Sequence, residues 1–146
     1  MHDSLSSPLS HYFRQMLSAQ EPCSPSKHLA QGAECVSAGD LAGLHRLLPE
    51  VMTKAGLITA SQRLRQRVEL LAAFLRESPA AAASPAHREA AFVLYYFLKG
   101  QDLIPDSIPE IGLLDDALLV DTAIQRNLLA LRSHLADRKQ PWPENV

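Results

Sequence analysis

Residues 90–98 read Ala-Ala-Phe-Val-Leu-Tyr-Tyr-Phe-Leu, and this run decides the fold of the chain. At the helical period of 3.6 residues, its large side chains point to every side of the helix axis. A helix that is apolar on all sides must be covered by partners on all sides. We therefore expect a helix over about residues 85–99, opened by Ser84 and Pro85, at the centre of the molecule.

Caps, prolines and glycines divide the rest of the chain into further helices. We expect one helix to begin near residue 8, and four others to cover about residues 25–38, 40–56, 59–77 and 114–137. Asp40 is the expected cap of the third of them, and residues 59–62 form an expected capping box. Pro49 is expected to kink or split its helix, because it lacks the amide donor.

No alternating pattern is long enough to indicate a strand. The sequence therefore predicts an all-α bundle of five or six helices that forms one domain over residues 1–146. We expect the ends, residues 1–6 and 140–146, to be mobile. Residues 101–112 contain three helix breakers and predict a proline-rich, acidic loop or a single helical turn.

Composition excludes several classes of protein. The chain has 146 residues, of which 47% are hydrophobic and 21% charged, which is typical of a globular protein. Its formal net charge of −2 gives no long-range attraction to nucleic acid. The longest uncharged apolar run, 90–98, and shorter ones such as 117–120 fall short of the roughly 20 residues that span a bilayer. Without a secretory signal or a disulfide framework, we expect a cytoplasmic protein.

One acid of the last predicted helix lies where burial is expected. Leu114, Ala117, Val120, Ile124, Leu128, Leu131 and Leu135 form an apolar arc on the helical wheel. Asp121 falls inside this arc, and a buried carboxylate needs a partner because its desolvation is expensive. The expected partners are Lys99, Arg88, the hydroxyl of Tyr95 or Tyr96, and Gln125. Asp121 is therefore either a satisfied core carboxylate or a functional acid.

Four more aspartates precede Asp121 within twenty residues. Asp115 and Asp116 are expected in the first turn of the last helix, where they favour its positive dipole end. Asp102 and Asp106 are expected to close turns by bonding to local backbone. Together the five acids also suggest an oxygen-rich site for magnesium or calcium. Their spacing matches no calcium-binding loop, so capping is the favoured interpretation.

The stretch from Tyr95 to Asp116 resembles the YkvA-like domain of unknown function (DUF1232). That family shows an apolar helix, then Asp-Leu-Ile-Pro-Asp, a short gap with Ile-Pro, a glycine and an Asp-Asp pair. The matching residues are Asp102, Leu103, Ile104, Pro105, Asp106, Ile108, Pro109, Gly112, Asp115 and Asp116. The resemblance extends more weakly over residues 64–120, and we expect a domain core over about 64–136. It implies a helical hairpin with a rigid acidic turn, and it implies no activity.

The chain departs from the family pattern at four positions. Gly100 and Gln101 stand where members often have Ser-Pro, and Ser107 and Leu113 stand where they often have aromatic residues. Some members look membrane-associated. The polar residues at Ser107 and Glu110 argue against membrane insertion of this chain.

Two other groups of residues carry weaker hypotheses. Cys23, His28 and Cys35 do not have the spacing of a zinc site, so packed core cysteines are favoured. Arg63, Arg65, Arg67 and Arg76 make one predicted helix basic. A solvated face is favoured there over nucleic-acid binding, because no aromatic residues are interleaved.

The leading functional hypothesis is a non-enzymatic helical interaction or scaffold protein that needs no cofactor and binds an unknown protein partner or a second copy of itself. The first alternative is a divalent-metal-binding protein or hydrolase that uses Asp102, Asp106, Asp115, Asp116 and Asp121. The second alternative is peripheral association with a membrane through an amphipathic helix.

Overall fold

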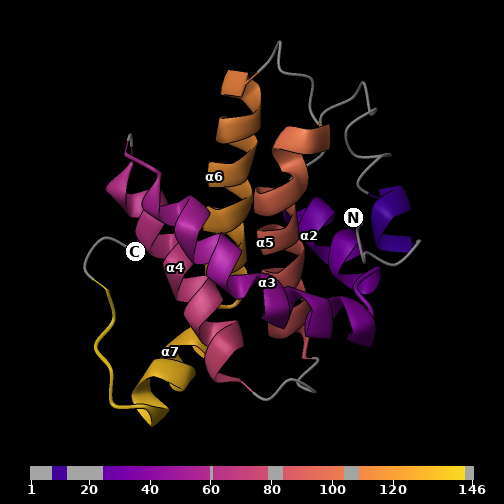
Figure 1. Ribbon diagram of the computed structural model, residues 1–146. Helices are drawn as coiled ribbons and strands as arrows, with labels where there is room; N and C mark the ends of the chain where they lie inside the picture. The colour runs from indigo at the N-terminus through magenta and orange to yellow at the C-terminus, as the bar shows by residue number, and fades with distance from the viewer. Residues whose placement is uncertain (1–7, 13–24, 60, 79–83, 104–108, 144–146) are drawn as a thin grey trace.

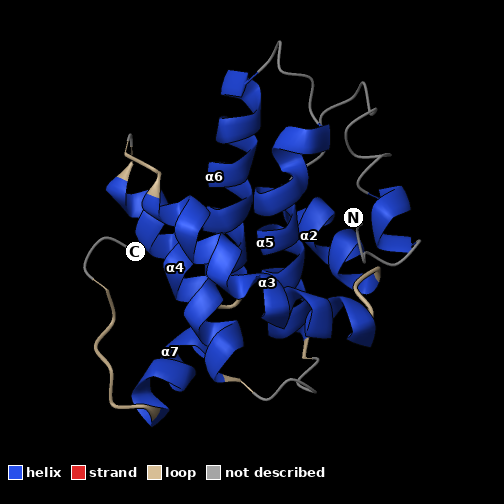
Figure 2. Cartoon of the chain, viewed as in Figure 1, coloured by secondary structure: helices blue, strands red, loops and turns tan. Residues whose placement is uncertain are grey.

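The computed structural model describes residues 8–12, 25–59, 61–78, 84–103 and 109–143 (Figure 1), and describes residues 25, 99–103 and 109–116 by their backbone. Its regular elements within these ranges are all helices (Figure 2). They are, after a short helical stretch at residues 8–12, α2 (Pro25–Glu34), α3 (Ala38–Gly56), α4 (Gln62–Glu77), α5 (Pro85–Leu103), α6 (Pro109–Arg126) and α7 (Leu128–Asp137). The prediction of an all-α helical bundle is confirmed.

Helix α5 is the centre of the bundle. Every residue from Ala90 to Phe97 is at most 3% exposed. Helices α2, α3, α4 and α6 all contact α5 and are arranged around it (Figure 1). Each large side chain buried in this way stabilises the fold by about 1.5–3 kcal/mol relative to exposure. Within the described part of the chain, no helix combines the length and the apolar character that crossing a membrane requires.

Helix α3 begins one turn earlier than predicted. Ser37 is its N-cap, and the Ser37 hydroxyl accepts a hydrogen bond from the amide of Asp40 at 3.1 Å. The Asp40 carboxylate in turn accepts from the amide of Ser37 at 2.9 Å, which completes a capping box. The prediction that Asp40 is the cap was wrong, because Gly39 does not end α2 but lies in the first turn of α3.

The Asp40 backbone also connects α3 with the centre of the bundle. Its carbonyl oxygen accepts a hydrogen bond from the buried hydroxyl of Tyr95 at 2.6 Å. Asp40 itself is 1% exposed. The capping box and the tyrosine bond together hold the start of α3 against α5.

Three further features of the helices differ from the prediction. Pro49 lies inside a continuous α3, so it does not split the helix. Ser61, not Thr59, caps α4, and its hydroxyl accepts from the amide of Leu64 at 3.1 Å. Helix α2 ends at Glu34, four residues before the predicted end. At Pro49 the surrounding packing outweighed the local breaker, and at α4 the hydroxyl of Ser61 set the first turn.

The two helices that flank the predicted loop both extend into it. Helix α5 continues past Gly100 to Leu103, and α6 begins at Pro109, a favoured residue for the first helical position. Within the predicted loop over 101–112, residues 101–103 and 109–112 are therefore helical, and residues 104–108 lie outside the described residues. The predicted helix over 114–137 is interrupted at Asn127, where α6 gives way to α7.

Helices α2 and α5 approach closely at Gly32. A Cβ atom built on Gly32 would lie 2.3 Å from Cε1 of the Phe92 ring. Phe92 is fully buried, so its ring has no free space into which it can move. The absence of a side chain at Gly32 therefore sets the distance between the two helices.

We expect Gly32→Ala to destabilise the fold by about 1–3 kcal/mol, because the methyl group overpacks the Phe92 ring. Gly56→Ala is the matched control, since nothing lies within 4 Å of a Cβ atom built there. Urea unfolding followed by circular dichroism measures both. A Gly32→Ala protein as stable as the control would contradict the close approach.

Candidate functional site

The acids of the predicted cluster are only partly described. Asp102 lies in the last turn of α5, and Asp115 and Asp116 lie in the second turn of α6. These three residues, with Pro109 and Gly112, are described by their backbone only. Pro105 and Asp106 lie outside the described residues. Because α6 begins at Pro109, the prediction that Asp115 and Asp116 occupy the first turn was wrong.

Asp121 is the one predicted site residue whose side chain is described. Its carboxylate is 32% exposed and lies 2.9 Å from the guanidinium of Arg67 on α4. Its own helix adds a weaker hydrogen bond from Gln125, at 3.4 Å. Gln125 was an expected partner and Arg67 was not. Asp121 is less buried than predicted, because its side chain lies at the edge of the core.

Arg67 was expected on a solvated face, and this expectation was wrong. Its side chain is only 12% exposed. Burial lowers the pKa of Arg67, and the neighbouring Asp121 carboxylate opposes that change by stabilising the guanidinium. The pair therefore joins α4 to α6. An ion pair with this burial orients two helices, and it leaves Asp121 bound to a cation of the chain itself.

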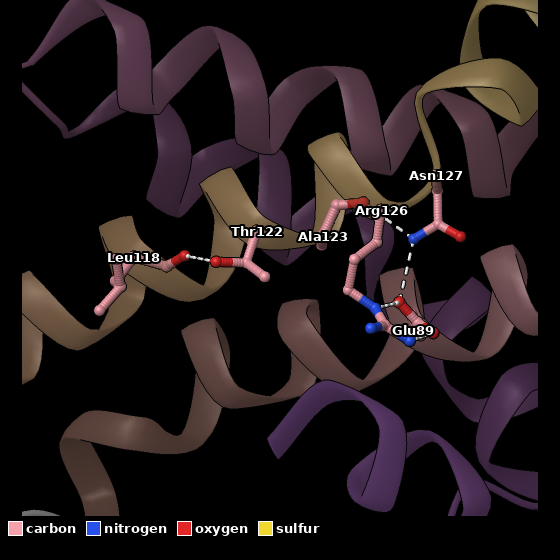
Figure 3. A network of polar contacts seen from close by, with 6 residues as sticks. All are labelled: Glu89, Leu118, Thr122, Ala123, Arg126 and Asn127. Atoms are coloured by element: carbon pink, nitrogen blue, oxygen red, sulfur yellow. Dashed lines mark hydrogen bonds and ion pairs between the residues drawn. The ribbon is translucent and has the colours of Figure 1, made fainter. Parts of the chain in front are cut away.

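A second carboxylate, Glu89 on α5, lies deeper than Asp121 (Figure 3). Glu89 is 5% exposed and receives two hydrogen bonds from the Arg126 guanidinium, at 2.9 and 3.0 Å. The side-chain amide of Asn127 donates a third hydrogen bond to Glu89, at 3.1 Å. The same side-chain amide also donates to the Ala123 carbonyl at 2.8 Å. The bond with Glu89 raises the pKa of Arg126, although burial acts in the opposite direction.

This network fixes the point at which α6 ends. Arg126 is the last residue of α6, and Asn127 stands between α6 and α7. Glu89 holds both of them against the first half of α5. The sequence carries a signal for this network, because Glu89 directly precedes residues 90–98, the run that is apolar on all sides. The argument applied to Asp121, that an acid among buried neighbours needs a partner, also predicts one for Glu89.

A third group of polar contacts joins α4, α5 and α7 around Phe74. The Phe74 ring stacks on His87 with centroids 4.6 Å apart and meets His134 edge-on at 5.2 Å. His134 and Arg138 each lie 2.9 Å from one carboxylate oxygen of Glu77. The Ser84 hydroxyl lies 2.6 Å from Nδ1 of His87. These contacts hold α7 against the end of α4.

Within the described ranges, no group of three or more His, Cys, Asp or Glu side chains could hold a metal ion. Cys23 lies outside the described residues, while Cys35 is a half-buried free thiol whose pKa is raised by burial. His28 hydrogen bonds to the Tyr12 hydroxyl at 3.0 Å. The described polar groups that we expected to carry chemistry are thus engaged in contacts between helices.

The outer side of α6 and α7 carries exposed leucines. Leu118 on α6 is 51% exposed, and Leu129 at the start of α7 is 85% exposed. Between them the Thr122 hydroxyl donates to the Leu118 carbonyl at 2.8 Å, and Figure 3 shows Leu118 and Thr122 on one side of α6. We call Leu118, Thr122, Gln125 and Leu129 the α6–α7 face.

We expect Arg126→Gln to destabilise the protein by about 2–3 kcal/mol, because it leaves the buried Glu89 carboxylate without its main partner. Glu89→Gln should cost less, about 1 kcal/mol, since the partly exposed Arg126 can regain water. The double variant should be more stable than Arg126→Gln alone. Urea unfolding of the two single variants and the double variant tests this double-mutant cycle. Glu50→Gln, at an exposed position, is the control and should change the stability by less than about 0.5 kcal/mol. Additive losses would show that the pair is not coupled.

The stability of the protein should also depend on His87. Burial lowers the pKa of His87, and the nearby His134 and His45 add to this effect. Between that lowered pKa and the ordinary value of about 6.5, the unfolded chain binds a proton that the folded chain does not. Stability should therefore fall as the pH drops through about 6.5. His87→Gln should weaken this dependence in urea unfolding at a series of pH values, and an unchanged dependence would be evidence against it.

Comparisons with known proteins agree with the resemblance noted in the sequence. Residues 89–120 match a family model described as a protein of unknown function (DUF1232). The match runs from Glu89 on α5 to Val120 on α6 and includes the acidic segment between the two helices. No curated protein and no solved structure matches the chain. The segment that runs from α5 into α6 is therefore similar to a DUF1232 domain, a domain of unknown function.

Proposed function

We propose that this chain is a non-catalytic helical interaction module that binds a second copy of itself through the α6–α7 face. The observation that carries the proposal is the exposure of two leucines, Leu118 on α6 and Leu129 on α7, on consecutive helices. A single exposed leucine is ordinary on a protein surface, whereas apolar side chains gathered on one face are typical of an interface.

The position of the two leucines on consecutive helices supports self-association. They are eleven residues apart in the chain and lie on either side of the junction between α6 and α7 at Asn127. In a two-fold arrangement the same surface of both copies meets, and residues of one copy contact the reciprocal residues of the other. An antiparallel crossing of two α6–α7 faces places Leu118 of each copy opposite Leu129 of the other. Gln125 and Thr122 then lie between the two leucine contacts.

The neighbouring charges are compatible with this arrangement. Asp121 is bound by Arg67, and Arg126 is bound by Glu89. An ion pair already satisfied within the chain costs less to cover than a free charge does. The α6–α7 face can therefore lose its water without leaving these two charges unpaired.

We expect light scattering coupled to size exclusion to give a mass twice the 16.0 kDa of one chain. Leu129→Asp or Leu118→Asp should weaken the dimer at least about a hundredfold, because each change removes two buried leucines per dimer. Leu57→Asp is the matched control, since Leu57 is 75% exposed at the end of α3. The control should remain dimeric.

A chain that stays monomeric at all concentrations would overturn the proposal. A dimer that survives both substitutions in α6 and α7 would place the interface elsewhere. Unfolding curves of each variant separate a lost interface from a lost fold, because exposed positions should change the stability of the monomer by less than about 0.5 kcal/mol.

A further inference from the structure

A pocket of about 350 Å³ lies between α3 and α4, away from the α6–α7 face. Its lining residues are His45, Leu48, Pro49 and Met52 of α3, with Ala72 and Arg76 of α4. The volume is at the lower end of the range of small-molecule sites. The pocket goes beyond the proposed self-association, which uses other helices.

The floor of the pocket is apolar. Leu48 and Ala72 are both buried, at 4% and 1% exposure, and Met52 is half-buried beside them. Pro49 adds a ring to the wall and has no amide hydrogen to offer a ligand. Such a surface favours a hydrocarbon group, because its burial removes apolar area from water on both sides.

One wall of the pocket carries a cation that is only loosely held. The guanidinium of Arg76 is 57% exposed and lies 3.9 Å from Oε2 of Glu77. The other oxygen of Glu77, Oε1, already contacts His134 and Arg138 at 2.9 Å each. Glu77 therefore has three side-chain partners, and the contact with Arg76 is the longest of them. Arg76 can turn to an external anion at small cost.

We propose that the pocket binds a small monocarboxylate with an apolar chain, the chain against Leu48, Met52 and Ala72 and the carboxylate on Arg76. The planar guanidinium matches a carboxylate through two parallel hydrogen bonds. No acid is among the six described lining residues, so a cationic ligand finds no counter-charge there. A strongly hydrated dianion such as free phosphate would have to give up water against an apolar floor.

The test uses the full chain labelled with ¹⁵N and titrated separately with octanoate and with octanol, which share a chain and differ in charge. Octanoate should shift the amide signals of Leu48, Met52 and Arg76 in a saturable manner. Octanol should bind more weakly by about fivefold, the size expected for one partly exposed ion pair. Shortening the carboxylate should weaken binding by up to about fourfold for each methylene that the pocket covers.

Arg76→Gln should remove the preference for octanoate over octanol and leave octanol binding unchanged. Arg63→Gln is the matched control, since it makes the same charge change at an exposed position of the same helix. It should keep the preference. Met52→Glu provides a second variant, because a carboxylate on the wall should repel octanoate at least as strongly as the loss of Arg76 does.

Equal binding of the acid and the alcohol to the unchanged protein would overturn the assignment of the ligand class. The absence of saturable shifts at the pocket residues would overturn the site itself. A short peptide ending in leucine that bound far more tightly than octanoate would replace the small molecule by a protein partner. None of these outcomes depends on whether the chain forms a dimer, so the two proposals fail separately.

Discussion

The burial of α5 on every side is the constraint on which the rest of the structure depends. A helix with aromatic and branched side chains around its whole circumference is unstable in water until other helices cover it. Four helices do so, and each contributes one apolar side to the common core. Where coverage is tightest, between Gly32 and Phe92, a single methyl group has no room. Where a polar atom enters the core, as at Tyr95, it bonds to the backbone of a neighbouring helix.

Charged side chains then fix how the covering helices are placed. Glu89 joins α5 to the end of α6, Asp121 joins α6 to α4, and Glu77 joins α4 to α7. A carboxylate that is partly or fully withdrawn from water is costly without a partner, so each of these acids restricts the positions that two helices can take. These three acids thus act as structural contacts, and the surfaces proposed for binding are the α6–α7 face and the pocket between α3 and α4.

Helix α4 shows how position decides the role of a residue. Arg67 and Arg76 are nine residues apart, which places them on opposite sides of the helix. Arg67 points toward α6 and forms an ion pair with Asp121, whereas Arg76 lines the pocket beside α3. The same residue type therefore serves as a contact between helices at one position and as the proposed recognition group at the other.

The sequence by itself determined the helical class, the central position of residues 90–97 and the likeness of the acidic segment to the DUF1232 family. These features are local, because they follow from periodicity and from residues close together in the chain. It also indicated that Asp121 needs a partner. Only the tertiary structure decided that this partner is Arg67 and that Glu89 binds Arg126. It also decided that Arg76 and His45 line the same pocket. Such pairs join residues that are far apart in sequence, and their choice depends on how helices pack, which helical periodicity does not specify.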